Sequence, residues 1–182
     1  MAAADNILKN FNLFIEGIGY AGNIEELQLP TLTVKTEEHR VGGMDAPTKV
    51  DMGMEAMEAS FTLTKYDELA LATIGRAIKN ISVTARGAVQ SLDGSVKEIV
   101  VKMTGKVVTY EPSAWKAGEK HTQKFTMSLI YYHQLVDNKP LHLIDVPNMV
   151  RMIAGVDQLA GIRNAIGVET SIADIPQNIV GI

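Results

Sequence analysis

The sequence predicts one mainly β domain with two short helices, and three observations predict it. Segments in which apolar and polar residues alternate with a period of two fill the first three quarters of the 182-residue chain. The apolar spacing becomes helical around residues 67–75 and again around 157–166. A hydrophobic content of 46% with 21% charged residues is ordinary for a globular protein, and the length is sufficient for one core.

The first strands lie on either side of turn signals. An apolar stretch from Leu13 to Ile18 precedes a turn around Gly19 to Gly22. The extended segment 24–38 is interrupted at Pro30, because proline cannot donate a hydrogen bond to a strand ladder. From residue 57 to 64, apolar and polar side chains alternate, which predicts a strand with one buried face.

A short helix and a hairpin are expected next. Asp67 is a plausible N-cap and Gly75 a plausible terminator of a helix that would place Leu69, Ala70, Ile74 and Ala77 on one side. Ile81, Val83 and Ala85 then begin a strand. Asp93-Gly94 predicts a tight turn into the next strand.

Two long strands follow, over residues 97–110 and 122–136, separated by a loop over 111–121. The first would bury Ile99, Val101, Met103 and Val107, and the second would bury Phe125, Met127, Leu129 and Tyr131. Both exceed the usual strand length of about five or six residues. Such strands can reach beyond their own core into a sheet shared with other copies, or bend within a closed barrel. The sequence leaves both explanations open.

The end of the chain changes character after Pro147. The "DNK" turn at 137–139 leads into a strand over 141–146. We expect residues 148–154 to be helical or irregular, and a helix from about Asp157 to Ile166, with Gly167 as its C-terminal cap. Residues 169–182 have the pattern of an extended tail.

Composition excludes several classes of site and partner. The chain has no cysteine, so disulfides, thiol nucleophiles and cysteine-ligated metals are absent. A net charge of −4 without a basic cluster argues against binding to duplex nucleic acid. The N-terminus has no signal-peptide pattern and no apolar run reaches the roughly 18 residues that span a bilayer. We therefore expect folding in a cytoplasm and no membrane insertion.

Catalytic and metal-binding patterns are also missing. The histidines His39, His121, His133 and His142 match no metal-ligand spacing. His133 and His142 could approach each other diagonally across the "DNK" hairpin, but Asp137 and Asp145 complete no recognised pattern. There is no phosphate-binding loop and no nucleophile elbow. We therefore predict no catalytic residue, no cofactor and no metal.

Apolar residues in polar settings point instead to protein contacts. The Gly-rich segment 39–54 carries three methionines, which are flexible and suit a surface that packs on another chain. We predict that it is an extended assembly loop that docks on a neighbouring subunit. Its contact residues are predicted to be Val41, Gly42, Gly43, Met44, Asp45, Pro47, Lys49, Asp51, Met52, Gly53 and Met54. Trp115 lies in a polar loop and is either a lid over the end of the barrel or an anchor on a partner protein.

Three motifs, in order along the chain, resemble the major tail tube proteins of contractile-tailed bacteriophages, the family of P2-like phages and R-type pyocins. They are "FNLFIEGIGYAGNIEELQLPTL" (11–32), "EEHRVGGMDAPTKVDMGME" (37–55) and "KPLHLIDVPNMVRMIAGVDQLAGIRNAIGV" (139–168). The middle of the chain matches in pattern more than in letters. The resemblance covers residues 1–168 as one tail-tube domain, and the tail 169–182 lies beyond it.

This resemblance implies an antiparallel β-sandwich or barrel with one flanking helix, a long inter-subunit loop and a C-terminal helix. It implies hexameric rings that stack into the inner tube of a contractile tail, inside a sheath and between baseplate and tail-terminator proteins. The tube would assemble in the bacterial host cytoplasm. DNA would pass through it without specific binding, or ions would pass in a pyocin-like particle.

A tube lumen should be polar and should not bind DNA. Contacts that neutralise the phosphates would retain the DNA during its passage. We predict that the polar faces of the two long strands line it. The residues are Glu98, Lys102, Thr104, Lys106, Lys124, Thr126, Ser128 and Gln134. Their lysines require that acidic residues elsewhere dominate the lumen. The alternatives are the type VI secretion tube protein (haemolysin-coregulated protein) and a monomeric ligand-binding β-barrel. A hydrolase has no residue to support it.

Overall fold

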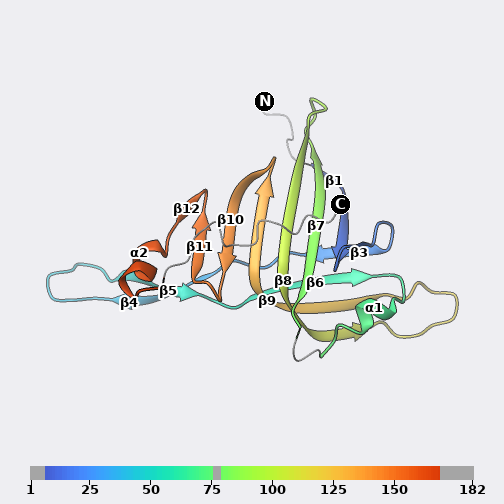
Figure 1. The fold of residues 1–182 in the computed structure, drawn as a ribbon, viewed down its shortest axis with the longest axis horizontal. Helices are drawn as coiled ribbons and strands as arrows, with labels where there is room; N and C mark the ends of the chain where they lie inside the picture. Colours follow the sequence, from blue (N-terminus) through green and yellow to red (C-terminus); the bar gives the residue numbers. More distant parts are fainter. Residues whose placement is uncertain (1–6, 76–78, 169–182) are drawn as a thin grey trace.

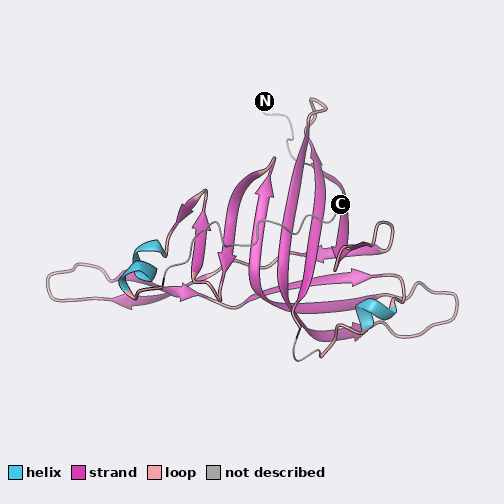
Figure 2. Ribbon diagram, in the orientation of Figure 1, coloured by secondary structure: helices cyan, strands magenta, loops and turns pink. Residues whose placement is uncertain are grey.

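The computed structural model of the chain describes residues 7–75 and 79–168. The predicted tail over 169–182 and the predicted helix residue Ala77 lie outside these ranges. Antiparallel strands make up most of the molecule, with two short helices at its margins (Figure 2). The mainly β fold class predicted from the sequence is therefore confirmed.

One large antiparallel sheet forms the body of the molecule (Figure 1). Its strands run in the order β12-β11-β10-β9-β8-β7-β1-β2. Their bounds are β1 Ile7–Ile15, β2 Ile18–Gly19, β7 Ile81–Gln90, β8 Val96–Pro112, β9 Gln123–Val136, β10 Lys139–Asp145, β11 Val150–Ile153 and β12 Val156–Asp157.

The turns of two hairpins are formed by residues with positive backbone φ angles. Asp137 and Asn138 have φ of 47° and 60° between β9 and β10, and Ala154 and Gly155 have 49° and 84° between β11 and β12. Two consecutive residues with positive φ match the twist of tight antiparallel hairpins.

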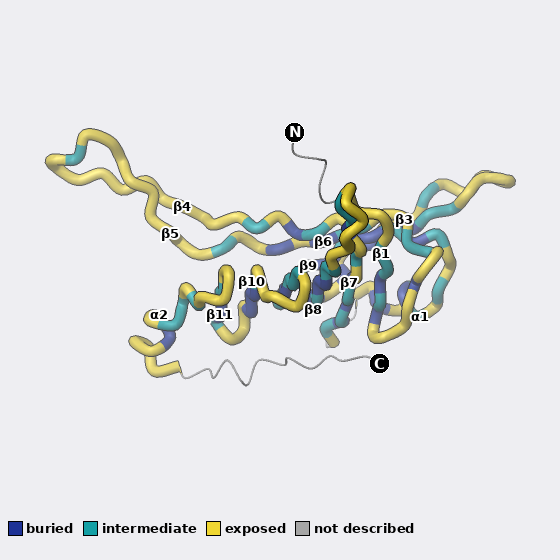
Figure 3. Tube along the Cα trace, turned by 90° about the horizontal axis from the view of Figure 1, so that it is seen from above, coloured by how far each residue is buried: buried dark blue, intermediate teal, exposed yellow. Residues whose placement is uncertain are grey.

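A two-stranded ribbon crosses one face of this sheet. β3 (Ile24–Gln28) pairs with β6 (Met57–Leu63), and β6 also pairs with β9. The same two chain segments continue into β4 (Val34–His39) and β5 (Thr48–Met54), which form a separate hairpin. We call the segment 34–54 the arm. Seen from above, the ribbon and the arm lie along one side of the sheet (Figure 3).

β9 is long because one of its edges serves two partners. Residues 123–129 pair with β6 and residues 131–136 pair with β10. The whole of β9 pairs with β8 on its other edge. A bulge near Ile130, where Thr104 faces Tyr131 but Gly105 faces Leu129, bends the strand between the two partners. The length of β9 is thus explained within one chain.

The main core lies between the sheet and the β3–β6 ribbon. β6 has the predicted alternation, with Met57, Ala59, Phe61 and Leu63 all buried. Phe61 faces Phe125 directly across the β6–β9 pair, and their rings stack with centroids 5.2 Å apart. A second, smaller cluster of Leu143, Val150, Tyr131 and Met152 lies on the opposite face of the sheet, which we call the outer face.

Both helices are shorter than predicted. α1 (Glu68–Leu71) begins where expected, because the Asp67 side chain accepts from the backbone N–H of Leu69 at 2.8 Å. It ends at Leu71 with Ala72 as its C-cap, three residues before Gly75. α2 (Ala160–Ala165) begins three residues after Asp157.

The expectation that residues 148–154 are helical or irregular is wrong, because Val150–Ile153 is strand β11. Its helical apolar spacing is overridden by pairing with β10 from Asp145↔Val150 to His142↔Ile153. The Asp145 carboxylate accepts from the backbone and side chain of Asn148, at 3.2 and 2.8 Å, and fixes the intervening turn.

Candidate assembly surfaces

The arm is the most exposed secondary structure of the molecule. Every residue of β4 is exposed, and β5 is exposed up to Met54. The predicted loop is therefore half strand, since Thr48–Met54 pairs with β4 and only residues 40–47 form the connecting tip. Of the three methionines, Met54 packs against the main core, Met44 is half-buried and Met52 is exposed. Met54 is thus a poor contact residue, whereas Met52 is available.

An ion pair ties the base of the arm to the far end of the sheet. Arg151 of β11 donates from both terminal nitrogens to the carboxylate of Asp51, at 2.6 and 3.4 Å. The Arg151 hydrogen bond, followed by the backbone N–H of Gly53, holds the pKa of Asp51 below its ordinary value. Because neighbouring strand residues point to opposite faces, Val50 and Met52 lie on the face of the arm away from this contact.

Replacing Arg151 with glutamine is expected to release the arm without unfolding the domain. Backbone amides of β5 should exchange with solvent about tenfold faster, as local opening becomes easier. Hydrogen exchange at pH 7 followed by mass spectrometry measures this. Lys49→Gln removes a neighbouring exposed cation and is the control. Unchanged exchange in Arg151→Gln would show that the ion pair does not hold the arm.

Two long strand edges are open within the described ranges. β7 pairs with β8 only as far as Gly105, so Val107–Pro112 has β9 as its one strand partner there. On the far side of the sheet, β2 pairs with only Phe14 and Ile15 of β1, which leaves the outer edge of residues 7–12 without a described partner strand. Open edges offer backbone donors and acceptors to another chain.

Seven of the eight residues predicted to line a lumen lie together on the outer face. They are Glu98, Lys102, Thr104, Lys106, Lys124, Thr126 and Ser128. Gln134 is on the opposite face, opposite Val101, where Tyr132 donates to its side chain at 3.2 Å. The bulge near Ile130 reverses the alternation of β9, so Tyr132 enters the core and Tyr131, predicted to be in it, joins the outer face.

The polar part of the outer face carries both signs of charge, because Glu58 lies opposite Ser128 and Glu111 lies opposite Lys124. Lys102, Lys106 and Lys124 share it with Arg86, which forms an ion pair with Glu98 at 3.2 Å. Lys102 lies directly opposite the buried His133, and burial followed by this positive charge lowers the pKa of His133. Glu58, Glu98 and Glu111 on the same face offset part of this positive charge.

Hydrogen bonds hold Trp115 in place although its side chain is 83% exposed. The indole N–H donates to the Tyr66 hydroxyl at 2.9 Å, and that hydroxyl lies 2.8 Å from Nε2 of His121. Nδ1 of His121 lies 3.0 Å from Ser113 Oγ. An indole only donates, so the Nδ1–H tautomer of His121 satisfies every pair in the network. With this exposure the ring covers little of the core.

The histidines predicted to approach each other do not form a site. His133 and His142 lie on opposite faces of the sheet, because His133 faces Leu143 and His142 faces Gln134. Residues 7–75 and 79–168 contain no group of three histidine, aspartate or glutamate side chains placed to hold a metal ion. No helix among them is long and apolar enough to cross a membrane.

Comparisons with known proteins agree with one another. The family model described as phage tail tube protein FII matches residues 5–167. The tail tube protein of Escherichia phage P2 is 29% identical over 165 residues, covering 88% of this chain and 96% of that protein. The major tail tube protein of Serratia phage KSP20 is 29% identical over 145 residues, covering 79% and 84%.

Solved structures share the fold at low identity. A chain of the sheath/tube terminator of the PVC extracellular contractile injection system has a TM-score of 0.58 at 9% identity, covering 74% of this chain and 99% of that one. A chain of the sheath-tube complex of the same system has a TM-score of 0.54 at 10% identity, covering 69% and 88%. At such identities the likeness concerns the fold alone.

Proposed function

The chain belongs to the phage tail tube protein FII family, and on that premise we propose that its copies close into hexameric rings that stack into the inner tube of a contractile tail. The tube would serve a phage or a phage-tail-like particle. Its activity is cooperative assembly, with no reaction and no cofactor.

The open edges of β1 and β8 carry this proposal. A monomeric sheet protein shields its edges with short strands, charges or covering elements. Here one edge runs over residues 7–12 and another over 107–112, with no partner strand among the described residues. Different surfaces of one chain that pair with each other produce heterologous contacts, which close into rings or extend into filaments.

Negative-stain microscopy of the purified chain tests the proposal. Rings or tubes with sixfold symmetry in end view are expected, and they should become more abundant with concentration. A chain that remains monomeric at hundreds of micromolar, measured by analytical ultracentrifugation, would exclude self-assembly as its activity.

The channel and the partners extend the same proposal. We place the seven outer-face residues from Glu98 to Ser128 toward the lumen, where DNA or ions pass without specific binding. The sheath protein would surround the tube, and baseplate and terminator proteins would bind its ends. In support, the structural neighbours come from a sheath-tube complex and a sheath/tube terminator. Assembly would take place in the host cytoplasm and the product would be part of the virion tail.

Shortening the arm is expected to abolish stacking while preserving the subunit. Replacing residues 42–53 with a short Gly-Ser linker removes β5 and the tip but leaves the main core, to which only Met54 of the predicted contact residues belongs. The variant should keep its strand-rich circular dichroism and yield single rings or monomers. A matched control replaces the exposed turn residues 92–94 of the β7–β8 hairpin. Normal tubes from the arm variant would show that the arm does not couple rings.

The family match also decides between the alternatives drawn from the sequence. It points to the phage branch instead of the type VI secretion tube, and to a tube subunit instead of a monomeric ligand-binding barrel.

A further inference from the structure

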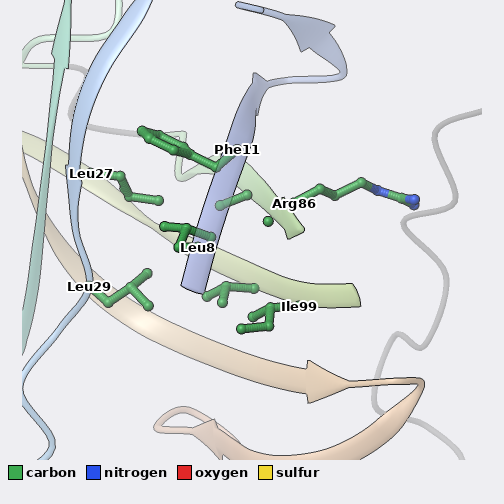
Figure 4. Close-up of a pocket in the computed structure, with 9 residues that line it drawn as sticks. Leu8, Phe11, Leu27, Leu29, Arg86 and Ile99 are labelled. Carbon is green, nitrogen blue, oxygen red and sulfur yellow. The ribbon is translucent and has the colours of Figure 1, made fainter. Parts of the chain in front are cut away.

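An apolar pocket opens beside the main core, between the sheet and β3 (Figure 4). Its cavity is about 140 Å³. An engineered apolar cavity of about that size stays dry and accepts a group the size of benzene. The walls are almost wholly apolar and come from β1, β7 and β8 on one side and from β3 and its C-terminal extension on the other. The lining residues used below are Leu8, Phe11, Leu27, Leu29, Gly87 and Ile99.

One wall of this pocket ends in an open strand edge. Leu27 lies opposite Phe61 in the β3–β6 pair, so Leu27 and Leu29 point from the ribbon toward the sheet. Among the described strands, β3 pairs with β6 alone. A strand added to the other edge of β3 would therefore insert alternate side chains in the same layer as Leu27 and Leu29, next to the pocket.

The arm has the complementary properties. It is a hairpin whose outward face carries Val50, 45% exposed, and Met52, 51% exposed. These are side chains small or flexible enough for a cavity of the pocket's size.

The arm cannot reach the pocket of its own chain. Asp51 is bound to Arg151 on β11, whereas the pocket is formed by β1, β7 and β8. Five strand spacings separate β11 from β1 in the sheet order, which is about 24 Å. The arm also projects away from the pocket end of the molecule (Figure 1). An arm seated in this pocket would therefore come from another copy.

We propose that the pocket is the receptor for the arm of a second copy, whose β5 strand pairs with the open edge of β3 and buries Val50 or Met52 beneath Leu8. This inference rests on the proposed tube assembly and names its contact. Because the arm and its receptor are different surfaces of one chain, the contact is heterologous, so each subunit uses both and the assembly can extend.

Cysteine cross-linking tests the contact cleanly, because the chain has no cysteine of its own. Particles are assembled from an equal mixture of the Val50→Cys and Leu8→Cys chains, oxidised briefly and digested. We expect a disulfide-linked peptide pair joining positions 50 and 8, at least about tenfold above two controls. The controls are Lys49→Cys with Leu8→Cys and Val50→Cys with Asn10→Cys. Each places one thiol on the opposite face of its strand, since Lys49 neighbours Val50 and Asn10 faces Ala88.

Filling the pocket gives a second, independent readout. A Cβ at Gly87 would meet only the end of the exposed Leu8 side chain, at 3.1 Å, and Phe11 Cβ at 4.0 Å. Valine is favoured in strands and the Leu8 side chain can shift, so Gly87→Val is expected to fold, which its melting temperature checks. We expect it to raise the concentration needed for assembly about tenfold or more, since it occupies the space of the arm's side chain. Ala88→Val, on the other face, should assemble normally.

The outcomes separate the two proposals. The receptor pocket would be overturned if the wild-type chain forms tubes but positions 50 and 8 show no enriched link. Normal assembly of Gly87→Val would overturn it as well. In both cases the tube proposal would still stand. A wild-type chain that forms no rings or tubes would overturn both.

Discussion

Replacing Gly105 with alanine is expected to destabilise the subunit severely. Gly105 lies in the middle of β8, where the bulge brings the backbone of β9 unusually close. An added Cβ would lie 2.1 Å from the carbonyl oxygen of Ser128 and 2.9 Å from the Cα of Leu129. These are backbone atoms of a paired central strand, so they cannot move aside as the end of a side chain can. We expect a loss of about 4 kcal/mol or more, in the range that marks severe core disruption.

Urea unfolding followed by far-ultraviolet circular dichroism measures this loss, together with the soluble yield. Gly42→Ala is the matched control, because nothing lies within 4 Å of its added Cβ and its φ is not positive. The control should retain wild-type stability to within about 0.5 kcal/mol. A Gly105→Ala variant as stable as the control would mean that β8 and β9 do not approach as closely as described.

Breaking the buried ion pair beneath α2 is expected to have the next largest effect. Arg163 and Asp157 are joined at 2.5 Å, and their side chains are only 5% and 6% exposed. Arg163 also donates to the backbone carbonyl of Met149 at 2.7 Å. Removing one partner of a buried pair leaves the other charged and unpaired, which costs about 3–5 kcal/mol. Arg163→Met should therefore detach α2 from the β11–β12 hairpin.

The same pair gives a defined dependence on pH. Burial tends to raise the pKa of Asp157, but hydrogen bonds from Arg163 and from the backbone of Leu159 outweigh it and hold the pKa below the ordinary 3.8. A carboxyl whose pKa is lower in the folded state contributes stability above pH 3.8, and that contribution is lost as the pH falls through the folded value. The stability difference between wild type and Asp157→Asn should thus be full at pH 7 and shrink toward pH 3.

Urea midpoints at both pH values, with hydrogen exchange of residues 156–166, measure these effects. The double variant Asp157→Asn/Arg163→Met removes both charges and should recover part of the loss, because no buried charge is left unpaired. If the double variant loses as much as the sum of the two single variants, the two residues do not act as a pair.

Local patterns predicted much of the architecture. Alternation along β6 and along the first half of β9 identified the buried faces, and the "DNK" and Asp93-Gly94 signals identified two hairpins. Asp67 was recognised as an N-cap because capping depends on neighbours in sequence. These features share one property: the residues that determine them lie within a few positions of each other.

The errors came from strand pairing and from a bulge, which the pattern within one segment does not contain. Helical spacing over 148–154 gave way to pairing with β10, which the local pattern does not contain. The bulge near Ile130 exchanged the faces of Tyr131 and Tyr132 and moved Gln134 away from the other predicted lumen residues. The arm's second half was taken for a loop because its partner, β4, lies on the far side of a Gly-rich tip.

The sequence by itself determined the β class, most strand faces, the main turns and the family resemblance. The period of apolar residues, the turn residues and the order of motifs all depend on residues that are close in sequence. Only the tertiary structure decided which strand edges stay open, that Asp51 binds Arg151, and that Leu8, Leu27 and Gly87 meet around a pocket. Strand order and register depend on hydrogen bonds between segments tens of residues apart, and the binding surfaces of this subunit lie where that pairing ends.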